Sequence, residues 1–356
     1  MKTIWLDVST PKHARYFTAL SKYLKKYGKY NFIFTGRRHA ESIGILRKLN
    51  VKFKVIGKHG GRNPQKKLES YIKRVINLSK YINSIDCKPD LLISFSCPEA
   101  CHVAFVHGIK SLALNDTPHA KHVNKLSLPL VDKLIIPKAI PVSKYMVFGI
   151  GIERIRVFNG VDELAWINEE ATDEDLITLG LKGSRFIVLR PMEFQASYLA
   201  GYAPKDDISL KIINEVLNLI EDVKIVYFPR YEEQRGITKI VKSKRLIIPK
   251  KPVNTLSLYK RADLVITGGG TMGREAALLG IPAISYFQGE KLDVNTFLKR
   301  LGFPIWELKD VDEVLHMVKK ILTSPDEFKL DTRKMIAQLE NPLDVIQQEV
   351  EALLRG

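Results

Sequence analysis

Short apolar runs alternate with amphipathic stretches along most of this 356-residue chain. In runs such as residues 3–8 (TIWLDV) and 90–94 (DLLIS) most side chains are apolar, which is typical of strands buried on both faces of a parallel sheet. Between such runs, apolar residues such as Tyr16, Leu20 and Leu24 recur at helical spacing. Because parallel strands need crossover helices, the alternation predicts an α/β fold. The expected strands are 3–8, 31–35, 52–56, 90–94, 111–114, 133–136, 186–190, 223–228, 245–248, 263–267 and 282–286.

The alternation is interrupted by the acidic and turn-prone residues 166–184. We therefore predict two doubly wound, Rossmann-like domains, an N-terminal one at 1–165 and a C-terminal one at 185–340, joined by that stretch as a linker. A last amphipathic helix at 341–356 closes the chain, with packing against the N-terminal domain as one option. Two such domains are expected to face each other across a cleft, and ligands bind outside the carboxyl ends of the strands.

Positive charge is concentrated at one end of the chain. The net charge is +17, and residues 1–80 alone hold 20 Lys or Arg against 3 Asp or Glu. A local basic excess points to nucleic acid, an anionic membrane or a phosphorylated substrate, with a lysine-rich solvated surface as the alternative. No apolar run approaches the roughly 20 residues of a membrane-spanning helix. Three cysteines and the lack of a signal peptide predict a cytoplasmic protein.

The most informative motif is DLVITGGGTMGREAALLGIP at residues 263–282. A buried strand runs into three glycines, and a helix of strong helix formers follows and stops at Gly280. Glycines let a backbone approach a bulky ligand, and a helix N-terminus attracts a pyrophosphate. The Glu275 carboxylate can accept hydrogen bonds from both hydroxyls of a ribose. The alternative is that the motif is a plain tight turn in which Glu275 only interacts with the helix dipole. The expected nucleotide contacts are Gly268, Gly269, Gly270, Thr271 and Glu275.

This arrangement of strand, glycines and E-A-x-x-x-G-x-P resembles the donor-binding half of GT-B fold glycosyltransferases. It is most similar to the peptidoglycan UDP-N-acetylglucosamine transferase and to the non-hydrolysing UDP-N-acetylglucosamine 2-epimerases. Over nearly its full length the chain also resembles an archaeal family of unknown function in that superfamily, through stretches such as DVSTPKH, SFSCPEA and NDTPHAKH. The resemblance implies a GT-B fold and leaves the activity open, because this superfamily hosts transferases, epimerases and hydrolases.

The resemblance also implies acceptor-side residues in the N-terminal domain. The loop after the first strand carries an acceptor-facing histidine in the GT-B transferases, and His13 holds that position, although the family's glycines are absent. The loop NDTPHAKH matches loops with a catalytic or sugar-contacting carboxylate, which makes Asp116 and His119 candidates. A histidine near its ordinary pKa can take a proton from an acceptor hydroxyl. The alternatives are a surface or N-cap histidine and an Asx-turn at Asn115.

Charged residues after other strands complete the expected donor site. Arg190 and Arg230 follow strands of the second domain, and a guanidinium can hold a diphosphate with its planar fork, unless each is a surface ion pair. The epimerases typically carry a histidine near the position of Arg190, so this departure argues mildly against epimerisation. Gln288 and Glu290 resemble the sugar-contacting loop of the superfamily, and Glu193 is expected to face the cleft.

No metal site is expected. Cys97, Cys101 and His102 lack a fourth ligand, and the D-x-D sequences at 173–175 and 310–312 follow no buried strand in a catalytic context.

Together these residues predict a metal-independent glycosyltransferase with a UDP-sugar donor, UDP-N-acetylglucosamine being favoured. The sugar nucleotide is the substrate, and no separate cofactor is expected. His13 or Asp116 would take the proton of the acceptor, while Arg190 and the helix N-terminus would stabilise the leaving diphosphate. A 2-epimerase-like enzyme is the first alternative. A non-enzymatic binder of nucleic acid or of an anionic surface is the second, although no nucleic-acid-binding signature is present.

The basic N-terminal domain also predicts a partner. Its charge is concentrated in amphipathic stretches at 12–29 and 58–80. We expect salt-sensitive contact with an anionic membrane at its inner face, and a lipid-linked or acidic acceptor, with a merely soluble lysine-rich surface as the alternative. No insertion is expected, because an apolar row should pack on the sheet. That row is Leu68, Tyr71, Ile72, Val75 and Ile76.

Overall fold

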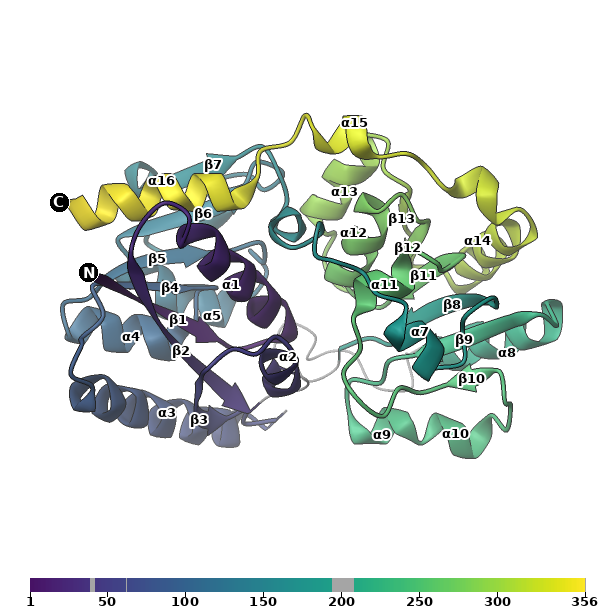
Figure 1. Cartoon of the computed structure of the whole chain (residues 1–356), viewed down its shortest axis with the longest axis horizontal. Coiled ribbons are helices and arrows are strands. Elements are labelled where there is room, and N and C mark those ends of the chain that lie inside the picture. Colours follow the sequence, from purple (N-terminus) through teal and green to yellow (C-terminus); the bar gives the residue numbers. More distant parts are fainter. Residues whose placement is uncertain (39–41, 62, 194–207, 356) are drawn as a thin grey trace. The chain divides into compact units, whose positions relative to one another are not determined.

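The computed structural model describes residues 1–38, 42–61, 63–193 and 208–355. The chain divides into two compact units: unit 1 is Met1–Trp166 with Leu339–Gly356, and unit 2 is Ile167–Gln338. Each unit is built on one sheet of parallel strands connected by helices (Figure 1). The predicted α/β class with two doubly wound domains is confirmed.

Seven strands form the sheet of unit 1 in the order β3-β2-β1-β4-β5-β6-β7. The order reverses between β1 and β4, and ligands bind at such a switch point in doubly wound sheets. The two central strands are almost wholly buried, as their apolar sequences predict. The strands are β1 (Lys2–Val8), β2 (Tyr30–Arg38), β3 (Lys54–Lys58), β4 (Leu91–Ser94), β5 (Lys110–Leu114), β6 (Lys133–Pro137) and β7 (Ile155–Phe158).

Helices of unit 1 begin with clear sequence signals. α1 starts at Pro11, and the side chain of Thr10 caps it by accepting from the backbone N of His13. The C-terminal helix α16 contacts α1, β4 and η3, all in unit 1. The helices are α1 (Pro11–Leu24), α2 (Ser42–Lys48), α3 (Pro64–Ser84), α4 (Pro98–Val106), α5 (Lys121–Ser127), α6 (Ser143–Met146) and α16 (Pro342–Arg355), with 3-10 turns η1 (Leu128–Leu130), η2 (Ile152–Arg154) and η3 (Asp162–Ala165).

Six strands form the sheet of unit 2 in the order β10-β9-β8-β11-β12-β13. The order reverses between β8 and β11, so the three glycines that follow β11 lie at the switch point of this sheet. The strands are β8 (Arg185–Arg190), β9 (Val223–Tyr227), β10 (Leu246–Ile247), β11 (Leu264–Thr267), β12 (Ala283–Ser285) and β13 (Ile305–Glu307).

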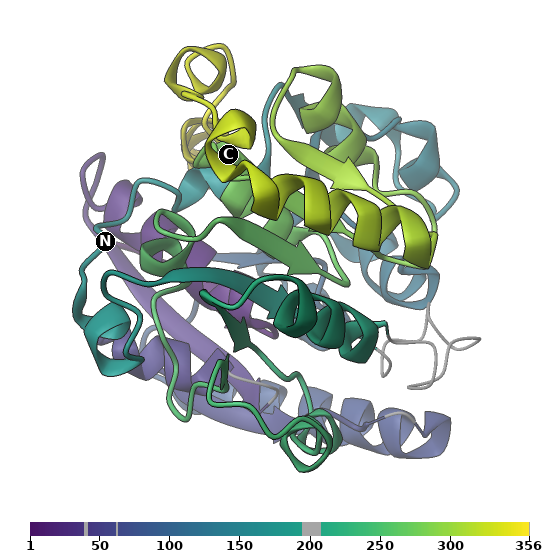
Figure 2. The same cartoon turned by 90° about the vertical axis from the view of Figure 1, so that its right-hand side faces the viewer.

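Helices α8 and α14 pack together on one face of the sheet of unit 2 (Figure 2). Their apolar sides, including Ile212, Ile213, Val318 and Ile321, join the strands in the core. The helices of unit 2 are α7 (Glu174–Thr178), α8 (Ser209–Leu219), α9 (Glu232–Arg235), α10 (Ile237–Ile240), α11 (Thr255–Tyr259), α12 (Thr271–Leu278), α13 (Asp293–Arg300), α14 (Val311–Thr323) and α15 (Arg333–Ile336), with a 3-10 turn η6 (Pro325–Phe328).

The acidic stretch between the two alternating series is folded onto unit 2. Trp166 is the last residue of the first segment of unit 1, and α7 lies within the stretch. The backbone N of Thr172 donates to Ser257 Oγ at 3.1 Å, and the backbone N of Asn254 donates to Asp175 Oδ2 at 2.5 Å. These bonds attach the stretch to α11 and to the loop before it.

The expected packing of the apolar row of α3 is wrong for three of its five residues, while Tyr71 and Val75 are half-buried. We expected Leu68, Ile72 and Ile76 to pack on the sheet, but their exposed fractions are 51%, 48% and 49%. The side of α3 that is buried instead carries Arg74, Leu78 and Ile82. No helix in the described part of the chain, α3 included, is long and apolar enough to cross a membrane.

Candidate functional site

The three glycines of unit 2 are held tightly against the end of β8. The backbone N of Gly268 donates to the carbonyl of Arg190 at 2.9 Å. A Cβ at Gly268 would lie 2.6 Å from both the N and the Cα of Met192, so this position accepts only glycine without a backbone shift. Ser285 Oγ donates to the carbonyl of Gly269 at 3.0 Å. The loop is therefore a fixed platform at the N-terminus of α12.

An arginine in the loop after β9 lies beside this platform. Arg230 follows β9, and its Nη2 lies 3.2 Å from the place that a Cβ of Gly269 would occupy. Its Nε donates to the carbonyl of Pro191 at 2.9 Å, which fixes the guanidinium. Arg190 ends β8 and is buried, with 6% of its surface exposed. The structure thus brings Arg230 next to the glycines, as the expected phosphate site requires.

A second arginine at the platform was missed by the sequence interpretation, which counted it only as a helix former. A Cβ at Gly270 would overlap Nη1 of Arg274, and the same nitrogen donates to Asn295 Oδ1 at 3.3 Å. Asn295 lies on α13, is fully buried, and its Nδ2 has no hydrogen-bond partner among the described residues. Arg274 and Asn295 therefore place a buried cation and an unused donor at the first turn of α12, where an anion is favoured.

The other expected donor-site residues are spread more widely. Thr271 is the first residue of α12, and Glu275 is buried in the same helix, 3% exposed. Glu193 accepts a hydrogen bond from Tyr231. Gln288 connects two loops, because its Nε2 donates to the carbonyl of Tyr286 after β12 and to that of Lys309 after β13. One further expected residue is exposed, namely Glu290.

In unit 1 the expected Asp116 is joined by two residues that were not predicted. Lys12 Nζ, near the start of α1, lies 2.7 Å from Asp116 Oδ2 and 2.7 Å from Asp162 Oδ2. It also lies 4.8 Å from the centroid of the Phe95 ring. The cation is thus shared by two carboxylates, one after β5 and one in η3. Only 4% of the Asp162 side chain is exposed, against 13% for Asp116.

The two carboxylates differ in their environments. Burial raises the pKa of Asp162 to about 6, and the nearby charge of Asp116 acts in the same direction, while Lys12 opposes both. A carboxyl group with a pKa near neutrality can exchange a proton at physiological pH. Asp116 is the more accessible member of the pair. The arrangement therefore offers one carboxylate to a substrate and a second one behind the shared lysine.

His13 is held in a neutral form. Burial lowers its pKa to about 3, and Lys12 and Arg37 act in the same direction. The ring stacks on Phe95 at a centroid distance of 4.5 Å, and Nδ1 accepts from the backbone N of Ser9 at 3.2 Å. Because Nδ1 is an acceptor, the proton of the neutral ring lies on Nε2. This geometry favours His13 as a hydrogen-bond donor and leaves the role of base to the carboxylates.

The loop after β5 contains the Asx-turn that was the alternative interpretation. Asn115 Oδ1 accepts from the backbone N of Thr117 at 2.7 Å, and Asn115 Nδ2 donates to Asn124 Oδ1 at 2.8 Å. This turn directs Asp116 toward Lys12, so the turn and the site coexist. His119 follows in the same loop and is half-buried.

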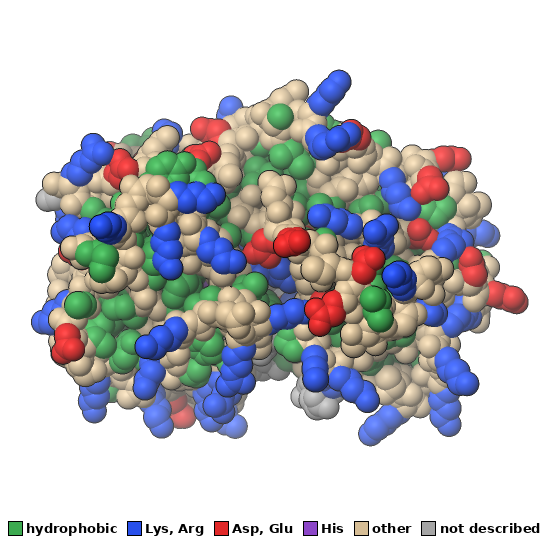
Figure 3. All heavy atoms as spheres, viewed as in Figure 1, with side chains coloured by type: hydrophobic (Ala, Val, Ile, Leu, Met, Phe, Trp, Pro, Cys, Tyr) green, Lys and Arg blue, Asp and Glu red, His purple; other side chains and the backbone are tan. Residues whose placement is uncertain are grey.

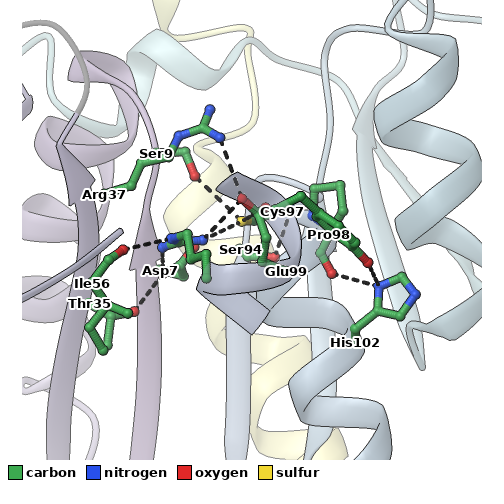
Figure 4. A network of polar contacts seen from close by, with 12 residues as sticks. Asp7, Ser9, Thr35, Arg37, Ile56, Ser94, Cys97, Pro98, Glu99 and His102 are labelled. Carbon is green, nitrogen blue, oxygen red and sulfur yellow. Dashed lines mark hydrogen bonds and ion pairs between the residues drawn. The ribbon is translucent and has the colours of Figure 1, made fainter. Parts of the chain in front are cut away.

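A buried polar network lies beside this site at the carboxyl ends of β1 and β4. Arg74 Nη2 lies 2.7 Å from Asp7 Oδ1, and Arg74 Nη1 donates to Cys97 Sγ at 3.3 Å. Figure 4 shows Asp7, Cys97 and Glu99 converging, with Arg37 near Glu99. The charge of Arg74 lowers the pKa of Asp7, although burial opposes this. In the described part of the chain no three His, Cys, Asp or Glu side chains are grouped as a metal site requires.

Solved structures with a similar arrangement of elements show the fold class of the chain. The Staphylococcus aureus MnaA–UDP structure has a TM-score of 0.72 with 14% sequence identity, covering 100% of this chain and 97% of that one. The UDP-GlcNAc 2-epimerase of Methanocaldococcus jannaschii, in complex with UDP-GlcNAc and UDP, has a TM-score of 0.67 with 18% identity, covering 100% of both chains. The fold is thus that of the UDP-GlcNAc 2-epimerases, of GT-B type, as the resemblance implied.

The sequence identifies the particular family. The model of DUF354, a protein family of unknown function, matches residues 2–355, and the chain belongs to this family. The uncharacterized protein MJ0665 of Methanocaldococcus jannaschii is 34% identical over 354 residues, which cover 98% of this chain and 97% of that protein. The recognised relationship to an unknown-function family with a GT-B-type fold is confirmed.

Proposed function

We propose that this protein binds a UDP-sugar through unit 2 and transfers the sugar to an acceptor hydroxyl without a metal ion. The observation that carries the proposal is the platform of glycines with Arg230 and Arg274 at the N-terminus of α12. Such a site suits a diphosphate, because backbone N–H groups and guanidinium groups both stabilise negative charge. Proteins of similar fold were solved with UDP and UDP-GlcNAc bound, which supports a UDP-sugar as the ligand that carries this diphosphate.

In the proposed reaction the bond between the sugar C1 and the β-phosphate oxygen breaks as C1 bonds to the acceptor oxygen. The electron pair leaves with UDP, whose growing charge is stabilised by α12 and its arginines. Glu275 accepts hydrogen bonds from the ribose. The acceptor proton passes to Asp116, whose Oδ2 lies 2.7 Å from Lys12 Nζ. His13 donates from Nε2 to an oxygen of the sugar or the acceptor.

A second candidate is the 2-epimerase reaction. It is supported by the fold of the neighbours and by the carboxylate pair in unit 1, since an epimerase must remove and return a proton. Asp116 and Asp162 have different environments, as an acid and a base on one lysine would need. The region near Arg190 in which the epimerases carry a histidine continues into residues 194–207, which lie outside the described residues.

The test is to incubate the protein with UDP-GlcNAc and to follow the products by proton NMR. UDP with N-acetylglucosamine bonded to an acceptor supports the transferase, and UDP-N-acetylmannosamine supports the epimerase. Asp116→Asn should lower turnover by about 10²–10⁴-fold and leave UDP affinity unchanged. Asp90→Asn is the matched control, because Asp90 lies before β4 at the opposite edge of the same sheet. Failure of the wild-type protein to bind UDP would refute both candidates.

A further inference from the structure

Helix α3 carries an apolar row and a basic row of exposed side chains. The apolar row repeats every four residues and consists of Leu68, Ile72 and Ile76, each about half exposed. The basic row repeats every seven residues and consists of Lys66, Lys73 and Lys80, all exposed. At about 100° per residue, the apolar row turns by about +40° with each step and the basic row by about −20°. The two rows therefore converge along α3, from nearly opposite sides at Leu68 and Lys66 to neighbouring positions at Ile76 and Lys80.

The neighbouring helix extends this surface. Phe105 and Val106 end α4, with exposed fractions of 62% and 77%. The two helices are joined by hydrogen bonds, Tyr71 Oη to His102 Nδ1 at 3.1 Å and Ser79 Oγ to His107 Nε2 at 2.8 Å. We call this surface the α3–α4 face. It comprises Leu68, Ile72, Ile76, Phe105 and Val106, bordered by Lys66, Lys73 and Lys80.

The apolar residues of this face are not needed to hold α3 in place. The helix is attached through its other side, where Leu78 and Ile82 are fully buried. On that side Arg74 Nε donates to the carbonyl of Ile56 at 2.9 Å and Nη2 reaches Asp7. In the space-filling view, hydrophobic side chains are interspersed with lysine and arginine over the region of α3 and α4 (Figure 3). Exposed apolar side chains gathered on one surface with a charged border are typical of an interaction surface.

We propose that the α3–α4 face docks onto an anionic lipid bilayer. The apolar row would lie at the boundary between headgroups and acyl chains, while the basic row contacts the negatively charged headgroups, as in amphipathic helices that lie in a membrane interface. The charge distribution favours this occupant. α3 contains one acidic residue, Glu69, and residues 1–80 carry 20 basic against 3 acidic residues.

A second copy of the chain fits the same face less well. A two-fold contact through the apolar row would bring the basic side chains of two copies of α3 into one interface. Glu69, whose Oε1 accepts from Gln65 Nε2 at 3.1 Å, would be the one acidic side chain that α3 offers from each copy. Like charges placed together in an interface oppose association. An anionic bilayer neutralises the same lysines instead.

Vesicle co-sedimentation tests the proposal on the full chain. The vesicles are phosphatidylcholine alone, or three parts phosphatidylcholine with one part phosphatidylglycerol, each at 50 mM and 500 mM NaCl. We expect pelleting with the anionic vesicles at low salt, and little with the neutral ones or at high salt. Ile72→Glu should reduce anionic binding at least tenfold, because it removes apolar area and adds repulsion. Lys73→Glu should weaken binding and also flatten its salt dependence.

Unit 2 offers matched control variants. Ile240 is 68% exposed on α10 and follows the exposed Lys239, so Ile240→Glu and Lys239→Glu make the same changes away from the α3–α4 face. Both controls should bind vesicles like the wild type. Circular dichroism melting, and UDP affinity if the wild type binds UDP, show whether each variant is folded. The vesicle result does not depend on the proposed sugar chemistry.

Two results would overturn the proposal. The first is equal or negligible pelleting of the wild type with neutral and anionic vesicles. The second is light scattering that shows a dimer which Ile72→Glu converts to a monomer, without vesicle binding by the wild type. In that case the α3–α4 face is a contact between copies of this chain.

Discussion

Replacing Arg230 with glutamine should weaken UDP binding strongly. In the structure its Nη2 lies 3.2 Å from the Cβ position of Gly269, and its Nε is fixed by the carbonyl of Pro191 at 2.9 Å. The guanidinium is therefore positioned before any ligand arrives. A hydrogen bond to a charged group contributes about 1.5–3 kcal/mol. At 1.4 kcal/mol per factor of ten, the Kd for UDP should rise by about 10- to 150-fold.

Isothermal titration calorimetry with UDP measures this change. The matched control is Arg261→Gln, because Arg261 is exposed in the turn before β11, at the opposite end of that strand from the glycines, and the substitution removes the same charge. The control should leave the Kd within about twofold of the wild type, since the interaction of distant exposed charges is largely screened by salt. Urea unfolding of both variants separates lost affinity from lost folding. Unchanged UDP affinity in a folded Arg230→Gln protein would refute the assignment of the platform as a diphosphate site, and equal losses in both variants would reduce it to a general charge effect.

Three further outcomes follow from the structure. Arg74→Met should lower the free energy of unfolding by about 3–5 kcal/mol, because it leaves the buried carboxylate of Asp7 without its partner; adding Asp7→Asn should recover part of this loss in urea titrations, and no recovery would contradict the explanation. His13→Gln should lose less stability than the wild type between pH 7.5 and pH 5, because the unfolded chain takes up a proton near pH 6.5 whereas the folded pKa is about 3, so the stability from neutral His13 falls as pH falls. Turnover of a UDP-sugar should persist in EDTA, since the described residues form no group of three metal-ligating side chains; activity that disappears and returns with magnesium would count against it.

The architecture could be predicted from the sequence because strands that are buried on both faces of a sheet are mostly apolar. β1 and β4 are mostly apolar, and their neighbours in the sheet follow the order that a doubly wound fold dictates. The glycines after β11 were predictable for a different reason. This loop lies against the backbone of Met192 and has no space for a side chain at Gly268. The glycine in the sequence therefore indicates the close approach.

The partners within each site were less predictable. Lys12, Asp116 and Asp162 are brought together from positions that lie up to 150 residues apart, and no spacing rule connects them. Arg274 and Asn295 meet across two helices in the same way. Residues of this kind are chosen by the geometry of the folded chain. Sequence alone marks them only as charged or polar side chains near the ends of strands.

The error on α3 has a physical cause that the sequence does record. Leu68, Ile72 and Ile76 form a regular apolar row, and so do Leu78 and Ile82 with Arg74 in the next turn toward the N-terminus. In an amphipathic helix the row without a charged residue is expected to face the core.

What decides the orientation is Asp7, a carboxylate within an otherwise apolar buried strand. A buried charge must be paired, so the helix that covers the end of β1 has to turn an arginine toward it. Arg74 meets that need at 2.7 Å, and the regular apolar row is left facing outward. The side chain that anchors α3 to unit 1 thus also leaves Leu68, Ile72 and Ile76 exposed, as the proposed docking on a bilayer requires.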